Sequence, residues 1–153
     1  MKIGVISDTH GHLDARVEKI FAGVKHILHA GDIGYASIIL ELEFIAPVTA
    51  VLGNCDNNIG YRLTETVELE KQKFLVHHIV NPLALSDPVT QRLAKEQPAA
   101  VVFGHTHRPF AEIINGVFFF NPGYAGKPKL GTERSVAILH CDEHGIRHEF
   151  IPL

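Results

Sequence analysis

The first 56 residues alternate three short apolar runs with two segments of helical periodicity, and this alternation limits the folds open to the chain. The apolar runs, at 2–7, 26–30 and 48–52, are rich in β-branched residues, as is typical of strands buried on both faces. Apolar residues recur at helical spacing over 13–22 and 37–45. The order strand–helix–strand–helix–strand predicts a parallel sheet with helices packed on it.

Beyond Arg62 the pattern changes to alternating strands and one further helix. Residues 64–70 alternate polar and apolar side chains and then turn into the apolar run 73–76, which predicts two paired strands. Pro88 favours the first turn of a helix, because proline lacks the N–H that would be unpaired there. Residues 99–103 form another short apolar run and predict a buried strand.

Two tight turns in the last third of the chain predict hairpins. Asn115-Gly116 is the strongest short signal for one, and a second turn is expected near His144-Gly145. Parallel units followed by antiparallel hairpins favour two mixed β-sheets packed face to face with helices outside, an α/β (α+β) fold. A length of 153 residues, without repeat or linker, predicts a single domain over residues 1–153.

Composition narrows the functional classes. The net charge is −3 and no basic stripe is present, so we expect no stable binding of nucleic acid. No apolar run reaches the ~18 residues of a membrane helix, and the first residues form a strand rather than a signal peptide. We therefore expect a soluble, cytoplasmic protein, and a homo-oligomer is compatible with this composition. Eleven histidines are unusually many, and imidazole is the commonest metal ligand among side chains.

Every apolar run predicted to be a buried strand is followed by side chains that can bind a metal ion. In chain order these are Asp8 and His10, Asp32, Asn54 and Asp56, His77 and His78, and His105 and His107. Ligand sites of α/β sheets lie outside the carboxyl ends of the strands, so these donors would converge if the strands are neighbours. Aspartate and asparagine are also common helix caps, but capping does not account for the histidines among these residues.

The kinds of donor indicate which ions the site would take. Cys55 and Cys141 are the only cysteines and lie far apart, so no structural zinc site or disulfide framework is expected. Mixed carboxylate and imidazole donors suit Mn, Fe, Zn or Ni in an open catalytic site. Seven or more donors exceed the need of one ion, and two ions that share a carboxylate fit the number better.

The motifs carried by these donors resemble, in order and spacing, those of the calcineurin-like metallophosphoesterases. They are D-T-H at 8–10, G-D at 31–32, G-N-C-D at 53–56, His77, G-H-T-H at 104–107 and N-P-G at 121–123. The short chain and the stretch Q-P-A-A-V-V-F-G-H-T-H-R-P are most similar to the small YfcE-like phosphodiesterase branch. The resemblance implies a four-layer αββα sandwich with two divalent metal ions, Mn being the expected species and Fe, Zn and Ni the alternatives.

The resemblance also implies a ligand set and a reaction. The first ion would be held by Asp8, His10, Asp32 and His107, and the second by Asp32, Asn54, His77 and His105, with Asp32 as the bridge. A hydroxide held by the two ions would attack the phosphorus of a small phosphodiester substrate. Asn54 and His12 are the residues expected to take a direct part in catalysis. A non-catalytic scaffold on the same fold, or a phosphomonoesterase or nucleotide hydrolase, is the alternative.

The sequence departs from the family pattern at two positions. Cys55 stands where the fuller motif has a histidine that can protonate the leaving group, so His12 becomes a candidate for that role. His78 follows His77, where the family usually has glycine, and we assign the ligand role to His77. Arg108 is either a phosphate clamp or a surface residue, and Asp56 either orients a neighbouring group or caps a turn.

Overall fold

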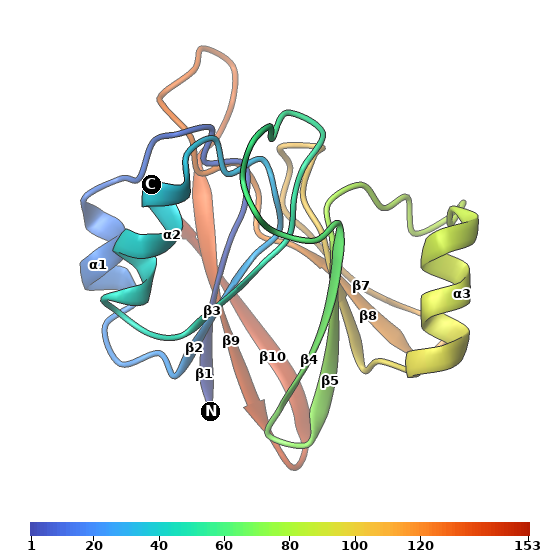
Figure 1. The fold of residues 1–153 in the computed structure, drawn as a ribbon. Helices are drawn as coiled ribbons and strands as arrows, with labels where there is room; N and C mark the ends of the chain where they lie inside the picture. Colours follow the sequence, from blue (N-terminus) through green and yellow to red (C-terminus); the bar gives the residue numbers. More distant parts are fainter.

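The computed structural model describes all 153 residues and contains two five-stranded sheets packed against each other (Figure 1). In the first sheet β1, β2 and β3 run parallel, and the C-terminal hairpin of β9 and β10 continues the sheet with β9 antiparallel to β1. The order of this sheet is β10 (Gly145–Pro152), β9 (Ser135–Asp142), β1 (Lys2–Ile6), β2 (His26–His29) and β3 (Val48–Ala50).

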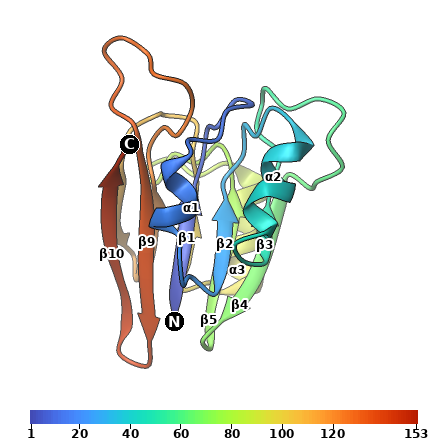
Figure 2. The same cartoon turned by 90° about the vertical axis from the view of Figure 1, so that its left-hand side faces the viewer.

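The second sheet is also mixed, with three parallel strands between two antiparallel edges. Its order is β4 (Thr64–Leu69), β5 (Gln72–His77), β6 (Ala100–Val102), β8 (Val117–Asn121) and β7 (Phe110–Ile114). Figures 1 and 2 show α1 (Arg16–Ile20) and α2 (Ala36–Glu43) outside the first sheet and α3 (Asp87–Glu96) outside the second. The predicted four-layer αββα sandwich of two mixed sheets is therefore confirmed.

Three apolar clusters fill the spaces between these four layers. The cluster between the sheets includes Val5, Phe74 and Val76, all fully buried. A second cluster joins α1 and α2 to the first sheet, and a third joins α3 to the second sheet. Both sheets are thus covered on each face, which accounts for their nearly continuous apolar strands.

The predicted turns and helices also appear, with one change at the first helix. Asn115 and Gly116 have φ of 50° and 80°, the positive pair that a tight hairpin turn requires. α1 begins at Arg16, whereas the sequence predicts a helix from Leu13. Asp14 precedes this start, where its carboxylate accepts the backbone N–H of Arg16 at 3.0 Å and a further hydrogen bond from Arg134, 120 residues away.

Asp14 also supports a prediction about acid stability. Hydrogen bonds from Arg16, and then from Arg134, hold the pKa of the Asp14 carboxyl well below its usual range. A lowered folded-state pKa contributes stability above the unfolded value of about 4, and this contribution is lost as the pH falls below it. In Asp14→Asn, the free energy of unfolding should therefore fall less between pH 6 and pH 3 than in the wild type. Urea unfolding at both pH values measures this, and equal losses in the two proteins would contradict it.

No helix of the structure combines the length and the apolar character that crossing a membrane requires.

Candidate metal centre

The loops that follow β1, β2, β3, β5 and β6 gather at one edge of the sandwich, the upper edge in Figure 1. Backbone hydrogen bonds tie these loops to one another. The N–H of Asp8 donates to the carbonyl of Gly31 at 3.0 Å, and the N–H of Gly104 donates to the carbonyl of His78 at 3.0 Å. The strand ends of both sheets therefore contribute to one site.

Asp8, which is fully buried, lies at the middle of this site. Its Oδ1 is 3.2 Å from Nε2 of His107 and 3.9 Å from Nε2 of both His10 and His78. Its Oδ2 accepts a hydrogen bond from the hydroxyl of Ser7 at 2.6 Å. One carboxylate oxygen is thus held by the protein while the other faces three imidazoles.

Asp32 supplies a second carboxylate, which is also buried. Its Oδ2 lies 3.3 Å from Nε2 of His78 and 3.6 Å from Nε2 of His10. Its Oδ1 accepts the backbone N–H of Cys55 at 2.8 Å. Asp32 therefore lies between the loops after β1, β3 and β5 and faces donors from each side.

Asn54 and His105 form the exposed rim of the site. Oδ1 of Asn54 lies 3.0 Å from Nδ1 of His105. The ring of His105 meets that of His78 edge-on, with centroids 5.4 Å apart. The structure thus brings together every predicted donor of the ligand set except His77, namely Asp8, His10, Asp32, Asn54, His105 and His107.

The sequence assigns the ligand role to His77, but the structure places His78 among these donors and His77 outside them. His78 is 2% exposed and faces both carboxylates, and it forms a candidate metal-binding group with Asp8 and Asp32. His77 instead places its Nδ1 2.8 Å from the hydroxyl of Thr64 on the neighbouring strand. His77 belongs to none of the candidate metal-binding groups.

The alternation of side chains along β5 explains this difference. Phe74 and Val76 point into the cluster between the sheets, and Leu75 points toward α3. Because successive side chains of a strand alternate between its faces, His78 continues the inner row and His77 the outer one. The site lies at the end of the inner row.

The contacts of His78 leave one of its nitrogens available to a metal ion. Its Nδ1 lies 2.7 Å from the carbonyl oxygen of Ala30, which only accepts, so Nδ1 carries the proton. Its Nε2 and Oδ1 of Asp8 are buried and have no hydrogen-bond partner. Burial also raises the pKa of the Asp8 carboxyl, which reflects the cost of keeping its charge away from water. A bound cation would satisfy both atoms and offset that cost, so the residues present fit a metal.

Five donors of the site have a positive φ, a left-handed backbone conformation that is uncommon for residues other than glycine. The donors with positive φ are Asp8 (56°), His10 (46°), Asp32 (52°), His105 (69°) and His107 (58°). Each such conformation costs a non-glycine residue roughly 1–2 kcal/mol. Residues held in sparsely populated conformations cluster at functional sites, because the surrounding structure must over-determine them.

Asp56 holds two of these loops together without facing the donors itself. Its carboxylate accepts backbone N–H groups from Ile33 at 3.1 Å, Gly34 at 2.9 Å and Gly53 at 2.8 Å. Of the two expectations for this residue, the structure therefore favours the orienting one. The three bonds fix the chain just after Asp32 and just before Asn54.

Replacing Asp56 should destabilise the fold. Asp56→Ala leaves these three N–H groups without their acceptor, and such losses cost about 1–3 kcal/mol in the free energy of unfolding. Denaturant unfolding measures the effect. Asn57→Ala is the matched control, because Asn57 is exposed and should change stability by less than about 0.5 kcal/mol. Equal stability of the two variants would show that Asp56 is not a clamp.

Three further residues expected near the site lie at its periphery. Cys55 is exposed and groups with His10 and Asp32. His12 belongs to no candidate metal-binding group, and its backbone N–H donates to the carbonyl of Thr9. Arg108 is exposed and takes part in none of the ion pairs formed by the arginines of the chain.

Sequence reasoning missed two supporting residues. The ring of Tyr124 packs 4.7 Å from that of His107 and 6.2 Å from that of His10. The amide of Asn121 donates to the carbonyl of Gly104 at 2.8 Å, which holds the loop that carries the rim. The N-P-G motif at 121–123 was the signal for this segment, but a motif does not say which of its residues reaches the site.

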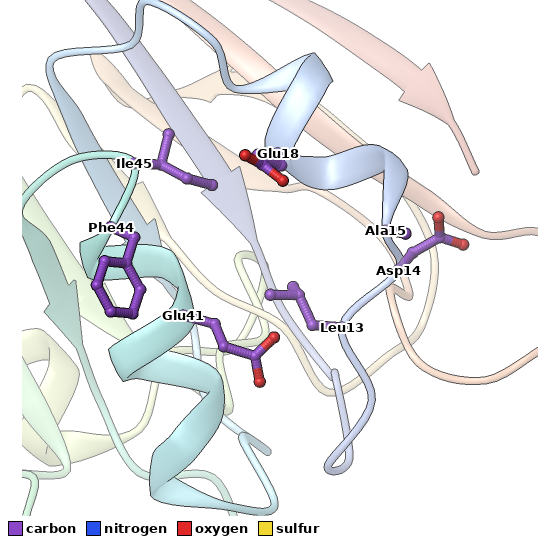
Figure 3. Close-up of a pocket in the computed structure, with 7 residues that line it drawn as sticks. All are labelled: Leu13, Asp14, Ala15, Glu18, Glu41, Phe44 and Ile45. Atoms are coloured by element: carbon purple, nitrogen blue, oxygen red, sulfur yellow. The ribbon is translucent and has the colours of Figure 1, made fainter.

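A separate hollow of about 460 Å³ lies between α1 and α2 (Figure 3). Its carboxylates are those of Asp14, Glu18 and Glu41, and none of the clustered donors lines it. Carboxylates repel an anionic phosphate, and no imidazole lines this hollow to complete a metal site. The metal centre is therefore the better candidate for chemistry.

The structure gathers carboxylates and imidazoles at the strand ends of a two-sheet sandwich, and comparison with known proteins identifies the family to which such a chain belongs. The profile of the calcineurin-like phosphoesterase superfamily domain matches residues 1–144. The chain belongs to this superfamily.

Relatives extend the likeness over nearly the whole chain. A probable metallophosphoesterase of Methanothermobacter thermautotrophicus is 34% identical over 99% of this chain and 92% of its own length. Phosphodiesterase YfcE of Escherichia coli K12 is 35% identical over 93% of this chain and 89% of its own. Among solved structures, an archaeal phosphodiesterase is 26% identical with a TM-score of 0.77 and full coverage of both chains.

Proposed function

We propose that the protein is a dinuclear metal-dependent phosphodiesterase. The observation that carries this proposal is the buried pair of unpartnered atoms, Oδ1 of Asp8 and Nε2 of His78, that face each other among further donors. When bound, divalent ions stabilise the negative charge that develops on a phosphoryl group and lower the pKa of water. The name of the relative YfcE supports a diester as the substrate.

The donors divide between two ions around a shared carboxylate. Asp32 is the proposed bridge, because imidazoles from two different loops, His10 and His78, face its Oδ2. The proposed sets are Asp8, His10, Asp32 and His107 for one ion, and Asp32, Asn54, His78 and His105 for the other. Carboxylate, amide and imidazole donors together favour Mn, with Fe, Zn and Ni as alternatives.

Residues of the chain prepare the site before any substrate arrives. Ser7 fixes the orientation of the Asp8 carboxylate, and Ala30 fixes the tautomer of His78. Packing against Tyr124 limits the rotation of His107. Partners of this kind typically account for about 10–100-fold in metal affinity or activity.

The proposed function is tested by comparing a diester with a monoester. With Mn²⁺ added, the protein should hydrolyse bis-p-nitrophenyl phosphate faster than p-nitrophenyl phosphate, and EDTA should abolish both reactions. Faster hydrolysis of the monoester would favour a phosphomonoesterase. Metal binding without turnover of either substrate would favour a non-catalytic scaffold.

Cys55 supports a prediction about leaving groups. A general acid is typically worth ~10²–10⁴-fold, but an acidic leaving group such as p-nitrophenolate needs little of it. Cys55→Ser should therefore change p-nitrophenyl turnover by less than about twofold. Cys55→His should raise turnover selectively for diesters with basic alkoxide leaving groups. The measurement is a leaving-group series on wild type, both Cys55 variants and His12→Ala.

The His12→Ala variant shows whether His12, rather than the residue at position 55, donates the proton to the leaving group. If the dependence on leaving-group pKa is flat in the wild type and steepens only in His12→Ala, then His12 is the acid. That outcome would contradict the prediction that the enzyme lacks a general acid because Cys55 stands in place of a histidine.

A further inference from the structure

A hollow of about 600 Å³ opens beside the metal centre, between the segment after β5 and the loop between β6 and β7. We refer to it as the Ile79 hollow. Its apolar walls include Ile79, Pro82, Phe103 and Phe110, and its polar lining includes His105 and Arg108. Its volume falls within the range of roughly 300–1,000 Å³ usual for small-molecule sites.

The Ile79 hollow and the metal centre share one side chain, that of His105. His105 lines the hollow, and the same imidazole lies 3.0 Å from Asn54 and packs edge-on against His78. A phosphoryl group at the metal centre would therefore direct one of its ester groups past His105 into the hollow. The reacting centre and the hollow are thus neighbouring parts of one site.

The chemistry of the walls indicates what kind of group fits. Ile79 is 47% exposed, and the rings of Phe103 and Phe110 in the same lining pack with centroids 5.8 Å apart. An apolar surface left open to water beside polar groups is typical of a ligand site. A small ester group such as methyl would leave most of this surface in contact with water, whereas a ring would cover it.

The polar lining favours a planar ring over an alkyl chain. Arg108 forms no ion pair, and a guanidinium stacks on flat ring faces as well as contacting anions. The hydroxyl of Thr106 already accepts from Asn121, so its own proton is free to be donated. An alkyl chain offers neither a flat face nor an acceptor to these groups.

We propose that the Ile79 hollow binds a planar ring carried by one ester group of the phosphodiester substrate, with Ile79 and Arg108 as specificity-determining residues. A nucleobase and a simple aryl group share this chemistry. The inference rests on the proposed function, because it takes the metal centre as the place of the phosphoryl group. It assigns the substrate class as ring-bearing phosphodiesters rather than dialkyl phosphodiesters.

Binding of phosphonates tests the inference without turnover, since each probe carries one organic group on a stable P–C bond. The probes are methylphosphonate, phenylphosphonate and 5′-deoxythymidine 5′-phosphonate, titrated by calorimetry into the Mn²⁺-loaded protein. The variant is Ile79→Asn, which removes apolar wall without adding charge. Its matched control is Ile113→Asn, because Ile113 is 74% exposed on β7 and does not line the hollow.

In the wild type, phenylphosphonate should bind at least about tenfold more tightly than methylphosphonate, as expected when an aromatic ring leaves water. Ile79→Asn should remove most of this advantage and change methylphosphonate binding by less than about threefold, and Ile113→Asn should behave as the wild type. Arg108→Gln should reduce the same advantage. Stronger binding of the thymidine probe than of phenylphosphonate would identify a nucleobase, and the reverse order an aryl group.

Two different results would overturn the inference or its basis. Equal affinities for phenylphosphonate and methylphosphonate, or equal weakening of both in Ile79→Asn, would overturn the ring-binding role of the hollow while leaving the proposed function intact. Failure of Mn²⁺ to bind the protein, together with no binding of any phosphonate, would overturn the proposed function itself.

Discussion

Asp32→Asn should lose both Mn²⁺ binding and phosphodiester turnover. An amide keeps the size of the carboxylate and can still accept the N–H of Cys55, so the fold should persist. It carries no negative charge, however, and its NH₂ group cannot act as a ligand beside His78 and His10. Because loss of an outer partner alone costs about 10–100-fold, loss of the bridge should lower turnover by at least about 100-fold.

Metal analysis and circular dichroism separate the possible causes of this loss. The purified variant should keep the spectrum of the wild type and retain less Mn²⁺ after dialysis. Wild-type turnover with full metal content would show that Asp32 does not bridge two ions.

His78→Ala should remove metal and activity, whereas His77→Ala should spare both. His78 faces Asp8 and Asp32 through an unpartnered nitrogen. Its removal should lower turnover by at least about 100-fold, as argued for the bridge. The imidazole of His77 lies against Thr64 in the second sheet and outside the donor cluster, so its loss should cost about 1 kcal/mol of stability and little turnover.

The two neighbouring histidines serve as each other's control, since both variants remove one imidazole from the same strand end. Mn²⁺ content, turnover and thermal stability are measured on both. If His77→Ala loses the metal and His78→Ala keeps it, the ligand assignment read from the structure is wrong.

The fold could be predicted in most of its elements, because strand alternation and turn residues act locally. The three parallel strands of the first sheet and the hairpin at Asn115-Gly116 follow from such signals. The predicted start of α1 was three residues too early, because the apolar spacing from Leu13 does not show that Asp14 accepts the N–H of Arg16 at the true start. The further contact of Asp14 with Arg134, 120 residues away, has no local signal in the sequence.

The site could be predicted as a set of strand ends but not in its detail. The donors that follow β1, β2, β3 and β6 can be predicted from the rule that ligand sites lie at the carboxyl ends of strands. To choose between His77 and His78, one must know which side chains of β5 point toward the other sheet. The apolar run does not reveal this, because both faces of β5 are buried. Supporting contacts such as Tyr124 with His107 depend on loops that no local pattern describes.

The central claim is tested most directly by titrating metal-free protein with Mn²⁺ while bound ions and turnover of bis-p-nitrophenyl phosphate are measured on the same samples. A dinuclear centre predicts about two ions per chain at saturation, turnover that rises with occupancy of both, and no turnover with excess EDTA. Saturation at one ion per chain, or full turnover in the presence of the chelator, would contradict it.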